Sequence, residues 1–97
     1  MVLDLAASAL INRIENNEEY VNYRVDQKLD ASGLTCPLPL LKAKQVLNGM
    51  QIGQILNVIC TDSGSVRDFQ VFCQQSGNQL LQSDEENGTY IYFLRKV

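Results

Sequence analysis

The sequence predicts an α+β fold, a two-layer sandwich in which a four-stranded mixed sheet carries two helices on one face. Four short stretches are rich in β-branched or alternating apolar residues, and two longer stretches place apolar residues at helical spacing. Turn residues separate these stretches, which follow one another in the order β-α-β-α-β-β. The chain has 97 residues, of which 45% are hydrophobic, so one small domain accounts for the whole pattern.

The beginning of the chain differs from the rest, and we expect residues 1–20 to be an N-terminal extension to a domain of residues 21–97. Apolar residues fall at helical spacing within the extension, at Leu3, Ala7, Leu10 and Ile14. A helix of about four turns is marginal in water when it is isolated. The extension therefore either frays, as chain termini often do, or docks on another surface such as a second copy or a partner.

Apolar and polar residues alternate over residues 20–30, which predicts the first strand. The apolar positions of this strand are Val21, Tyr23, Val25 and Leu29. Gly33 lies in the turn that follows, and the first helix is expected over residues 37–48, with Gly49 suited to its C-terminal cap. The apolar face of this helix consists of Leu40, Ala43, Val46 and Leu47.

The second half of the chain supplies three strands and the second helix. The strands are expected at residues 55–60, 80–83 and 89–94. Ser65 stands three residues before Asp68, a spacing that predicts a capping box at the start of the second helix, and Gly77 should end that helix. The apolar side of the helix consists of Val66, Phe69, Phe72 and Cys73. A turn over residues 84–88 contains Asn-Gly, which is a hairpin signal between the last two strands.

Residue counts exclude several classes of chemistry. The chain contains no histidine, so it can hold neither a Cys-His nor a Ser-His nucleophilic pair, nor an imidazole metal ligand. Its three cysteines, Cys36, Cys60 and Cys73, fit no complete set of disulfides, and none has the Cys-x-x-Cys spacing of redox and zinc motifs. We therefore expect free thiols and no metal site.

Charge and hydropathy bear on partners and location. The net charge is −3 and the basic residues are scattered, which argues against nucleic-acid binding even though sheets of this order can present an RNA-binding face. No secretory signal is recognisable, and no apolar run approaches the roughly 18 residues of a membrane span. We expect a cytoplasmic protein with no membrane partner, in a compartment that keeps thiols reduced.

Cys36 carries the strongest functional signal, because two prolines follow it at the expected start of the first helix. The sequence reads Cys36-Pro37-Leu38-Pro39, and proline is tolerated in a first helical turn, where N–H groups have no intrahelical acceptor. The partial positive charge of a helix N-terminus favours a thiolate and lowers the pKa of a cysteine thiol. We therefore expect Cys36 to be an exposed and reactive thiol, whereas the other two cysteines are expected to be buried and structural.

The stretch over residues 29–39, LDASGLTCPLP, resembles the signature of the TusA/SirA-like sulfur-carrier family. Members of that family open with Leu-Asp, a Gly and then Cys-Pro-x-Pro at the first helix. The resemblance continues through Gly53, Asp62, Arg67-Asp68 and the closing residues 92–96, and it covers residues 26–97.

The resemblance implies a sulfur carrier, which is a sulfurtransferase in the sense of a persulfide carrier, with the same sandwich fold. A donor, either a cysteine desulfurase or a rhodanese-like protein, would pass sulfane sulfur to Cys36, and the carrier would deliver it to an acceptor protein. No cofactor is implied. The implied site residues are Cys36 as the sulfur-bearing residue, Pro37 and Pro39 at the helix N-terminus, and Leu38, Leu41, Lys44 and Asp62 as partner contacts.

Several alternatives stay open at this point. Leu38 lies where tRNA-thiolation members of the family carry an acidic residue, which leaves the sulfur acceptor open. Lys42 and Lys44 either form a solvated helix face or steer an acidic partner, and Asp62 either shapes a turn or contacts a partner. A different function, a regulatory or redox-sensing binding module without sulfur turnover, would use the same surface.

Overall fold

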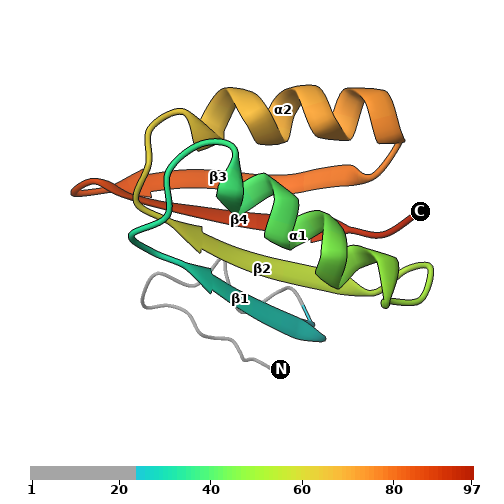
Figure 1. The fold of residues 1–97 in the computed structure, drawn as a ribbon. Helices are drawn as coiled ribbons and strands as arrows, with labels where there is room; N and C mark the ends of the chain where they lie inside the picture. Colours follow the sequence, from blue (N-terminus) through green and yellow to red (C-terminus); the bar gives the residue numbers. More distant parts are fainter. Residues whose placement is uncertain (1–23) are drawn as a thin grey trace.

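The computed structural model describes residues 24–97, in which two helices pack on one face of a four-stranded sheet (Figure 1). The elements are, in chain order, β1 (Gln27–Ala31), α1 (Leu38–Asn48), β2 (Ile55–Cys60), α2 (Ser65–Ser76), β3 (Gln79–Glu86) and β4 (Thr89–Arg95). This order and this two-layer architecture confirm the fold class predicted from the sequence. The extension expected at residues 1–20 and the strand residues expected at 20–23 lie outside the described residues.

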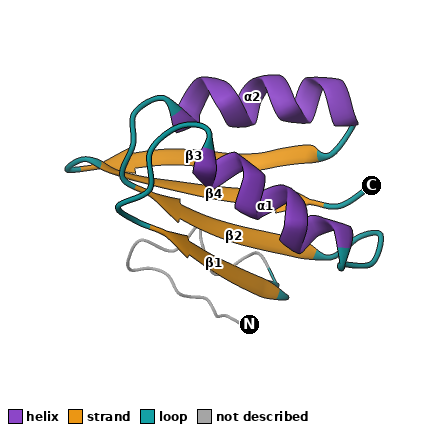
Figure 2. Cartoon of the chain, in the orientation of Figure 1, coloured by secondary structure: helices purple, strands orange, loops and turns teal. Residues whose placement is uncertain are grey.

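The sheet topology brings two loops together. Strand order is β1-β2-β4-β3, in which β1 is parallel to β2 while β4 is antiparallel to both of its neighbours. Ala31 at the end of β1 pairs with Cys60 at the end of β2, so both strands end at the same edge of the sheet. The loops that lead into α1 and α2 therefore leave the sheet next to each other, as Figure 2 shows.

The hydrophobic core lies between the sheet and the helices. The expected helix faces point into it, since Ala43 and Leu47 of α1 and Phe69 of α2 are buried. The Phe69 ring stacks on the ring of Tyr92 from β4, with 4.7 Å between the ring centroids. The other buried members of the cluster are Ala31, Met50, Leu56, Val58, Cys60 and Leu94. Apolar burial of this kind is the main stabilising contribution in so small a domain.

The first strand is shorter at its start than the sequence pattern predicted. Residues 24–26 are not part of the strand, and the ladder begins at Gln27. The reason is Asp26, whose backbone N–H donates to the carbonyl of Ile55 at 2.9 Å while its carboxylate accepts the N–H of Ile55, also at 2.9 Å. A side chain thus satisfies the first donor of β2 in place of a continuing strand.

The capping box predicted for α2 is wrong. Ser65 is the first residue of the helix rather than its cap, and the cap is Gly64, which has no side chain to form a hydrogen bond. The Ser65 hydroxyl is buried, 2.7 Å from the hydroxyl of Tyr92, and the Asp68 carboxylate faces another loop instead of the cap. Gly77 ends α2 in the left-handed conformation, with φ of 84°, as expected.

The last hairpin is tighter than the sequence pattern predicted. β3 continues to Glu86, where it pairs with Thr89, so the turn is only Asn87-Gly88 instead of residues 84–88. Both turn residues have positive φ, 53° and 81°, which matches the twist of the flanking strands and explains the Asn-Gly preference. The run of acidic residues that looked like a turn is therefore strand.

Helix α1 is held at both ends. It begins at Leu38 after Pro37, one residue later than expected. Gly49 caps the other end, as expected, in a right-handed conformation with φ of −92°. Lys96, beyond β4, donates its Nζ to the carbonyl of Leu47 at 2.6 Å, which satisfies a carbonyl of the last helical turn.

Candidate functional site

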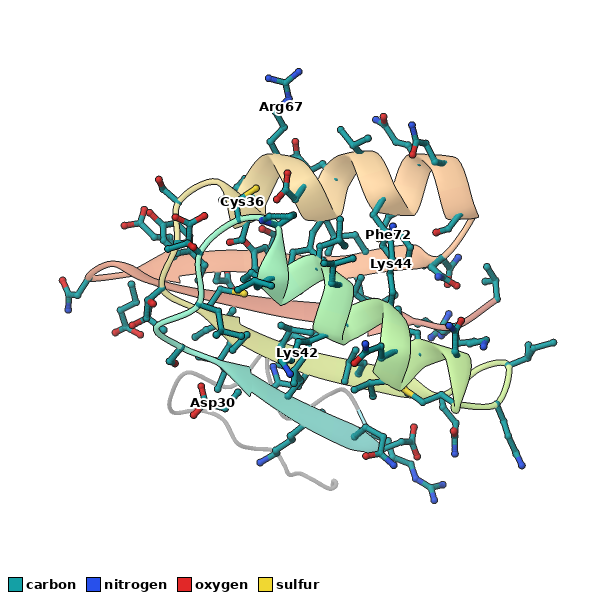
Figure 3. The ribbon with its side chains drawn as sticks, viewed as in Figure 1. Asp30, Cys36, Lys42, Lys44, Arg67 and Phe72 are labelled. Atoms are coloured by element: carbon teal, nitrogen blue, oxygen red, sulfur yellow. The ribbon has the colours of Figure 1, made fainter. Side chains whose placement is uncertain are left out.

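Cys36 lies in the loop between β1 and α1, next to the helix cap Pro37, and it is exposed (Figure 3). Two hydrogen bonds tie it to the α2 side of the molecule. Its backbone N–H donates to Oδ2 of Asp62 at 3.3 Å, and its Sγ–H donates to Oδ2 of Asp68, with 2.6 Å between sulfur and oxygen. The sulfur therefore sits where the two loops described above meet, between the starts of both helices.

The carboxylates oppose ionisation of this thiol. The pKa of the Cys36 thiol is raised above its ordinary value, first by the hydrogen bond to Asp68, then by desolvation and by the charges of Asp68 and Asp62. The expectation of a pKa lowered by the helix N-terminus is therefore wrong for the free thiol. Pro37 and Pro39 remove two N–H donors from the first turn, and the N–H of Leu38 already donates to Thr35, so few helix donors remain near the sulfur.

The two prolines of the motif have different environments. Pro37 is exposed as the cap of α1, whereas the side chain of Pro39 is fully buried in the core. Leu38 and Leu41, two of the expected partner contacts, are 45% and 46% exposed on the same helix. The motif thus anchors α1 through Pro39, while Leu38 within the motif and Leu41 beyond it remain accessible on the helix.

Close packing around Asp62 depends on a glycine. A Cβ at Gly64 would lie 2.9 Å from Oδ2 of Asp62 and 3.5 Å from Cβ of Cys36. Only a residue without a side chain allows the carboxylate to sit there and accept the Cys36 N–H. Asp62 also accepts the N–H of Ser65 through its backbone carbonyl, so this residue shapes the turn before α2, as one of the two sequence interpretations had it.

Within the described residues, neither Lys42 nor Lys44 of α1 forms an ion pair with Asp62 or Asp68. Lys44 places its Nζ 5.5 Å from the centroid of the Phe72 ring, in a cation–π contact between α1 and α2. Lys42 is exposed and lies apart from the Lys44–Phe72 contact (Figure 3). A groove between the helices has a volume of about 280 Å³ and is lined by Leu40, Lys44, Arg67, Asp68, Val71, Phe72 and Gln75. Asp68 belongs both to this groove and to the Cys36 site.

The other two thiols are less accessible. Cys60 is fully buried and Cys73 is half-buried, and burial raises the pKa of each thiol to about 11. Within residues 24–97, no three His, Cys, Asp or Glu side chains are grouped so that they could hold a metal ion. No helix in the same part of the chain is long and apolar enough to cross a membrane.

Comparison with known proteins identifies the family. A family model described as Sulfurtransferase TusA matches residues 27–96, which is most of the chain. The chain belongs to the TusA family. One TusA-family relative, the sulfur carrier protein TusA of Allochromatium vinosum, is 56% identical over 71 residues, which span 73% of this chain and 93% of the relative. Another, the sulfur carrier protein TusA of Pseudomonas putida strain GB-1, is 40% identical over 75 residues, or 77% and 94% of the two chains.

A solved structure supports the TusA-family fold. The SirA-like protein from Desulfitobacterium hafniense superposes with a TM-score of 0.63 and covers 71% of this chain and 95% of its own. Its sequence identity is 24%, so this likeness concerns the fold alone. The family model and the two relatives confirm the family resemblance stated from the sequence.

Sequence reasoning placed Cys36 at the helix start but missed how its sulfur is held. Asp68 was interpreted as a capping residue, although it hydrogen-bonds the thiol across 32 positions of sequence. Gly64 was not identified as a site residue from the sequence. The signal that could have found both is the TusA-like stretch from Asp62 to Asp68, which follows the strand paired with the one before Cys36.

Proposed function

We propose that this TusA-family protein is a sulfur carrier that accepts sulfane sulfur as a persulfide on Cys36 and passes it to an acceptor protein. The observation that carries the proposal is the setting of Cys36, an exposed thiol at a helix start in a chain 56% identical to a protein named sulfur carrier protein TusA. Neither Cys60 nor Cys73 offers a comparably accessible sulfur. Exposure matters because exchange requires access to the sulfur atom.

The transfer takes two displacement steps. Cys36 loses its proton, and the thiolate attacks the terminal sulfur of a persulfide on the donor protein, whose own cysteine sulfur leaves as a thiolate. The new S–S bond makes Cys36 a persulfide. A nucleophile of the acceptor then attacks the terminal sulfur, and the Cys36 sulfur leaves as a thiolate that takes up a proton. No cofactor takes part in either step. The donor is proposed to be a cysteine desulfurase or a rhodanese-like protein.

Partner contact is proposed for the surface around Cys36. Leu38 and Leu41 expose nearly half of their side chains on α1, and large exposed apolar residues near a reactive group are typical of contact surfaces. Lys44 lines the groove between the helices and could contact an acidic group on a partner. Asp62 contributes by holding the Cys36 loop as well as by its partial exposure.

Replacement of Cys36 by serine tests the proposal. We expect Cys36→Ser to abolish sulfur loading while changing the free energy of unfolding by less than about 1 kcal/mol, because the hydroxyl can also donate to Asp68 but cannot form a persulfide. The measurement is intact mass after incubation with a cysteine desulfurase and cysteine, where wild type should gain one sulfur atom.

Cys60→Ser is the matched control for this experiment. It places a hydroxyl in the core at a cost of roughly 1–3 kcal/mol when unpaired, so it should unfold more easily and still load. Loading of Cys36→Ser to the wild-type level would refute the carrier function. Reversible oxidation of Cys36 without any sulfur gain would favour the redox-sensing module instead.

A further inference from the structure

The proton of Cys36 points to a role for Asp68. The thiol donates its hydrogen to Asp68, and the second carboxylate, Asp62, accepts the N–H of the same residue. Both carboxylates therefore surround the cysteine that must become an anion before it can attack sulfur. A hydrogen bond from a thiol to a carboxylate stabilises the protonated form, and nearby negative charge acts in the same direction.

Within the described part of the chain no basic side chain forms an ion pair with Asp68, although Lys44 and Arg67 line the same groove. Arg67 is the neighbour of Asp68 in α2, but Figure 3 shows it extending away from the body of the molecule. Lys44 of α1 lies over the Phe72 ring, and the ion pair found within residues 24–97 joins Arg24 to Asp26, at the far end of β1. Asp30, at the other end of β1, is a further carboxylate, and it bonds Ser32.

We propose that Asp68 is a positioning residue that holds empty Cys36 in its thiol form, and that a cationic group of the docking sulfur donor releases this hold. The inference deepens the proposed carrier function and rests on it. A positive charge placed beside Asp68 would cancel the local field, so the proton could leave Cys36 at the moment when the donor persulfide is in reach. The empty carrier would meanwhile be protected from oxidants, because the thiolate is the reactive species.

Loading itself removes the contact with Asp68. In the first displacement the Sγ–H bond breaks, the proton passes to water or to the departing donor thiolate, and Sγ forms its second covalent bond to the transferred sulfur. The Sγ of a persulfide carries no hydrogen, so it has nothing to donate to Asp68. After delivery, the departing Cys36 thiolate takes up a proton and the hydrogen bond forms again. Asp68 therefore acts only on the empty carrier.

Charged thiol reagents test, without any sulfur donor, whether Asp68 keeps Cys36 in its thiol form. The probes are two methanethiosulfonates, one with a trimethylammonium group and one with a sulfonate group; each reacts when the thiolate attacks its sulfenyl sulfur, forming a disulfide and releasing methanesulfinate. Peptide mapping assigns the modification to Cys36. The ratio of the cationic to the anionic rate reports the field at Sγ, and the pH dependence of each rate reports the ionisation of the thiol.

We expect Asp68→Asn to lower the cation-to-anion rate ratio by roughly threefold to tenfold and to move the midpoint of the pH–rate profile to lower pH. Asp68→Glu keeps the charge and should retain most of the cation preference. Asp62→Asn, which removes a carboxylate not bonded to the sulfur, should have a smaller effect on both readouts. Glu85→Gln, on β3, removes one charge at an exposed position and should leave the ratio near wild type.

An unchanged ratio and an unchanged pH midpoint in Asp68→Asn would overturn the proposal. An equal change in Glu85→Gln would overturn it too, since the effect would then come from net charge alone. Thermal unfolding of each variant shows whether it is folded, and Asp68→Ser, which also removes the carboxylate, replaces Asp68→Asn if that variant is unfolded. These readouts need only a free thiol, so they stand apart from the sulfur-loading experiment that decides the carrier function.

Discussion

The Cys36 sulfur is subject to two opposing influences. A helix start favours a thiolate, but the prolines of the motif take away backbone donors, and Asp68 lies 2.6 Å from the sulfur. The hydrogen bond to this carboxylate raises the pKa of the thiol and so favours its protonated form. The free thiol is therefore the form that the isolated protein presents at neutral pH.

Gly64 provides a test of how closely the site is packed. Gly64→Ala should slow sulfur loading by roughly tenfold, because its Cβ would push Asp62 away and loosen the loop that positions Cys36. Stability should change little, since Gly64 has an ordinary helical φ of −65° and the displaced atom ends a side chain. The control is Gly49→Ala, whose added Cβ meets nothing closer than 3.7 Å. Equal loading by both variants would contradict the expectation.

At the residue scale, the sequence predicted the properties that depend on neighbouring residues, but not those that depend on residues far along the chain. The exposure of Cys36 and the burial of Cys60 follow from the residues directly around them, and both expectations are confirmed. The raised pKa of Cys36 depends on Asp68, 32 positions away, which only the folded sheet brings near. The local sequence around Cys36 therefore predicts the helix start, but it does not predict that the Asp68 carboxylate lies beside the sulfur.

At the element scale, α2 is connected to the sheet by a buried polar contact. The Ser65 hydroxyl lies 2.7 Å from the hydroxyl of Tyr92, at the start of the helix that carries Asp68. Burial raises the pKa of the Tyr92 hydroxyl, and the hydrogen bond to Ser65 acts against that rise. Because both groups are buried, each satisfies a polar atom that the core would otherwise leave without a partner.

A double-mutant cycle measures this contact. Ser65→Ala should lower the free energy of unfolding by about 1–3 kcal/mol, because it leaves the buried Tyr92 hydroxyl without its partner. Tyr92→Phe should also destabilise, but the double variant should lose less than the sum of the two single losses. Urea denaturation monitored by circular dichroism gives all three values. Strict additivity would mean that the two hydroxyls do not stabilise each other.

The sequence pattern predicted some boundaries of helices and strands correctly and others wrongly. The second strand was predicted at residues 55–60, as observed, because a β-branched run has few alternatives. The start of α2 was predicted to be a Ser65–Asp68 capping box, but both side chains bond to distant residues instead. A capping box and a pair of tertiary contacts have the same sequence spacing, so the pattern could not separate them.

At the scale of the whole molecule, the sheet order explains the site. Parallel pairing of β1 and β2 ends both strands at one edge, which brings the Cys36 loop next to the loop of Asp62 and Gly64. Neither loop contains the complete site. The order β-α-β-α-β-β could be predicted from turn signals and periodicity, whereas the pairing that joins these loops depends on which strands become neighbours.

Removal of residues 1–20 tests the expected domain boundary. The four strands and two helices that the structure describes lie between Gln27 and Arg95, so the shortened chain should keep a cooperative thermal transition. Differential scanning calorimetry of the full-length and shortened chains gives the comparison. Loss of the transition would place part of the extension in the core, and wild-type sulfur loading by the shortened chain would separate the extension from the carrier function.

The attachment of α1 at both ends has an entropic consequence for partner binding. Pro39 fixes the start of the helix in the core, and Lys96 holds its end through the carbonyl of Leu47. Leu38 and Leu41 are thus presented from a backbone that has already lost most of its freedom. Association then requires ordering of side chains rather than of the helix, which lowers the entropy lost on each encounter. A carrier that meets one protein to be filled and another to be emptied avoids this loss twice in every cycle.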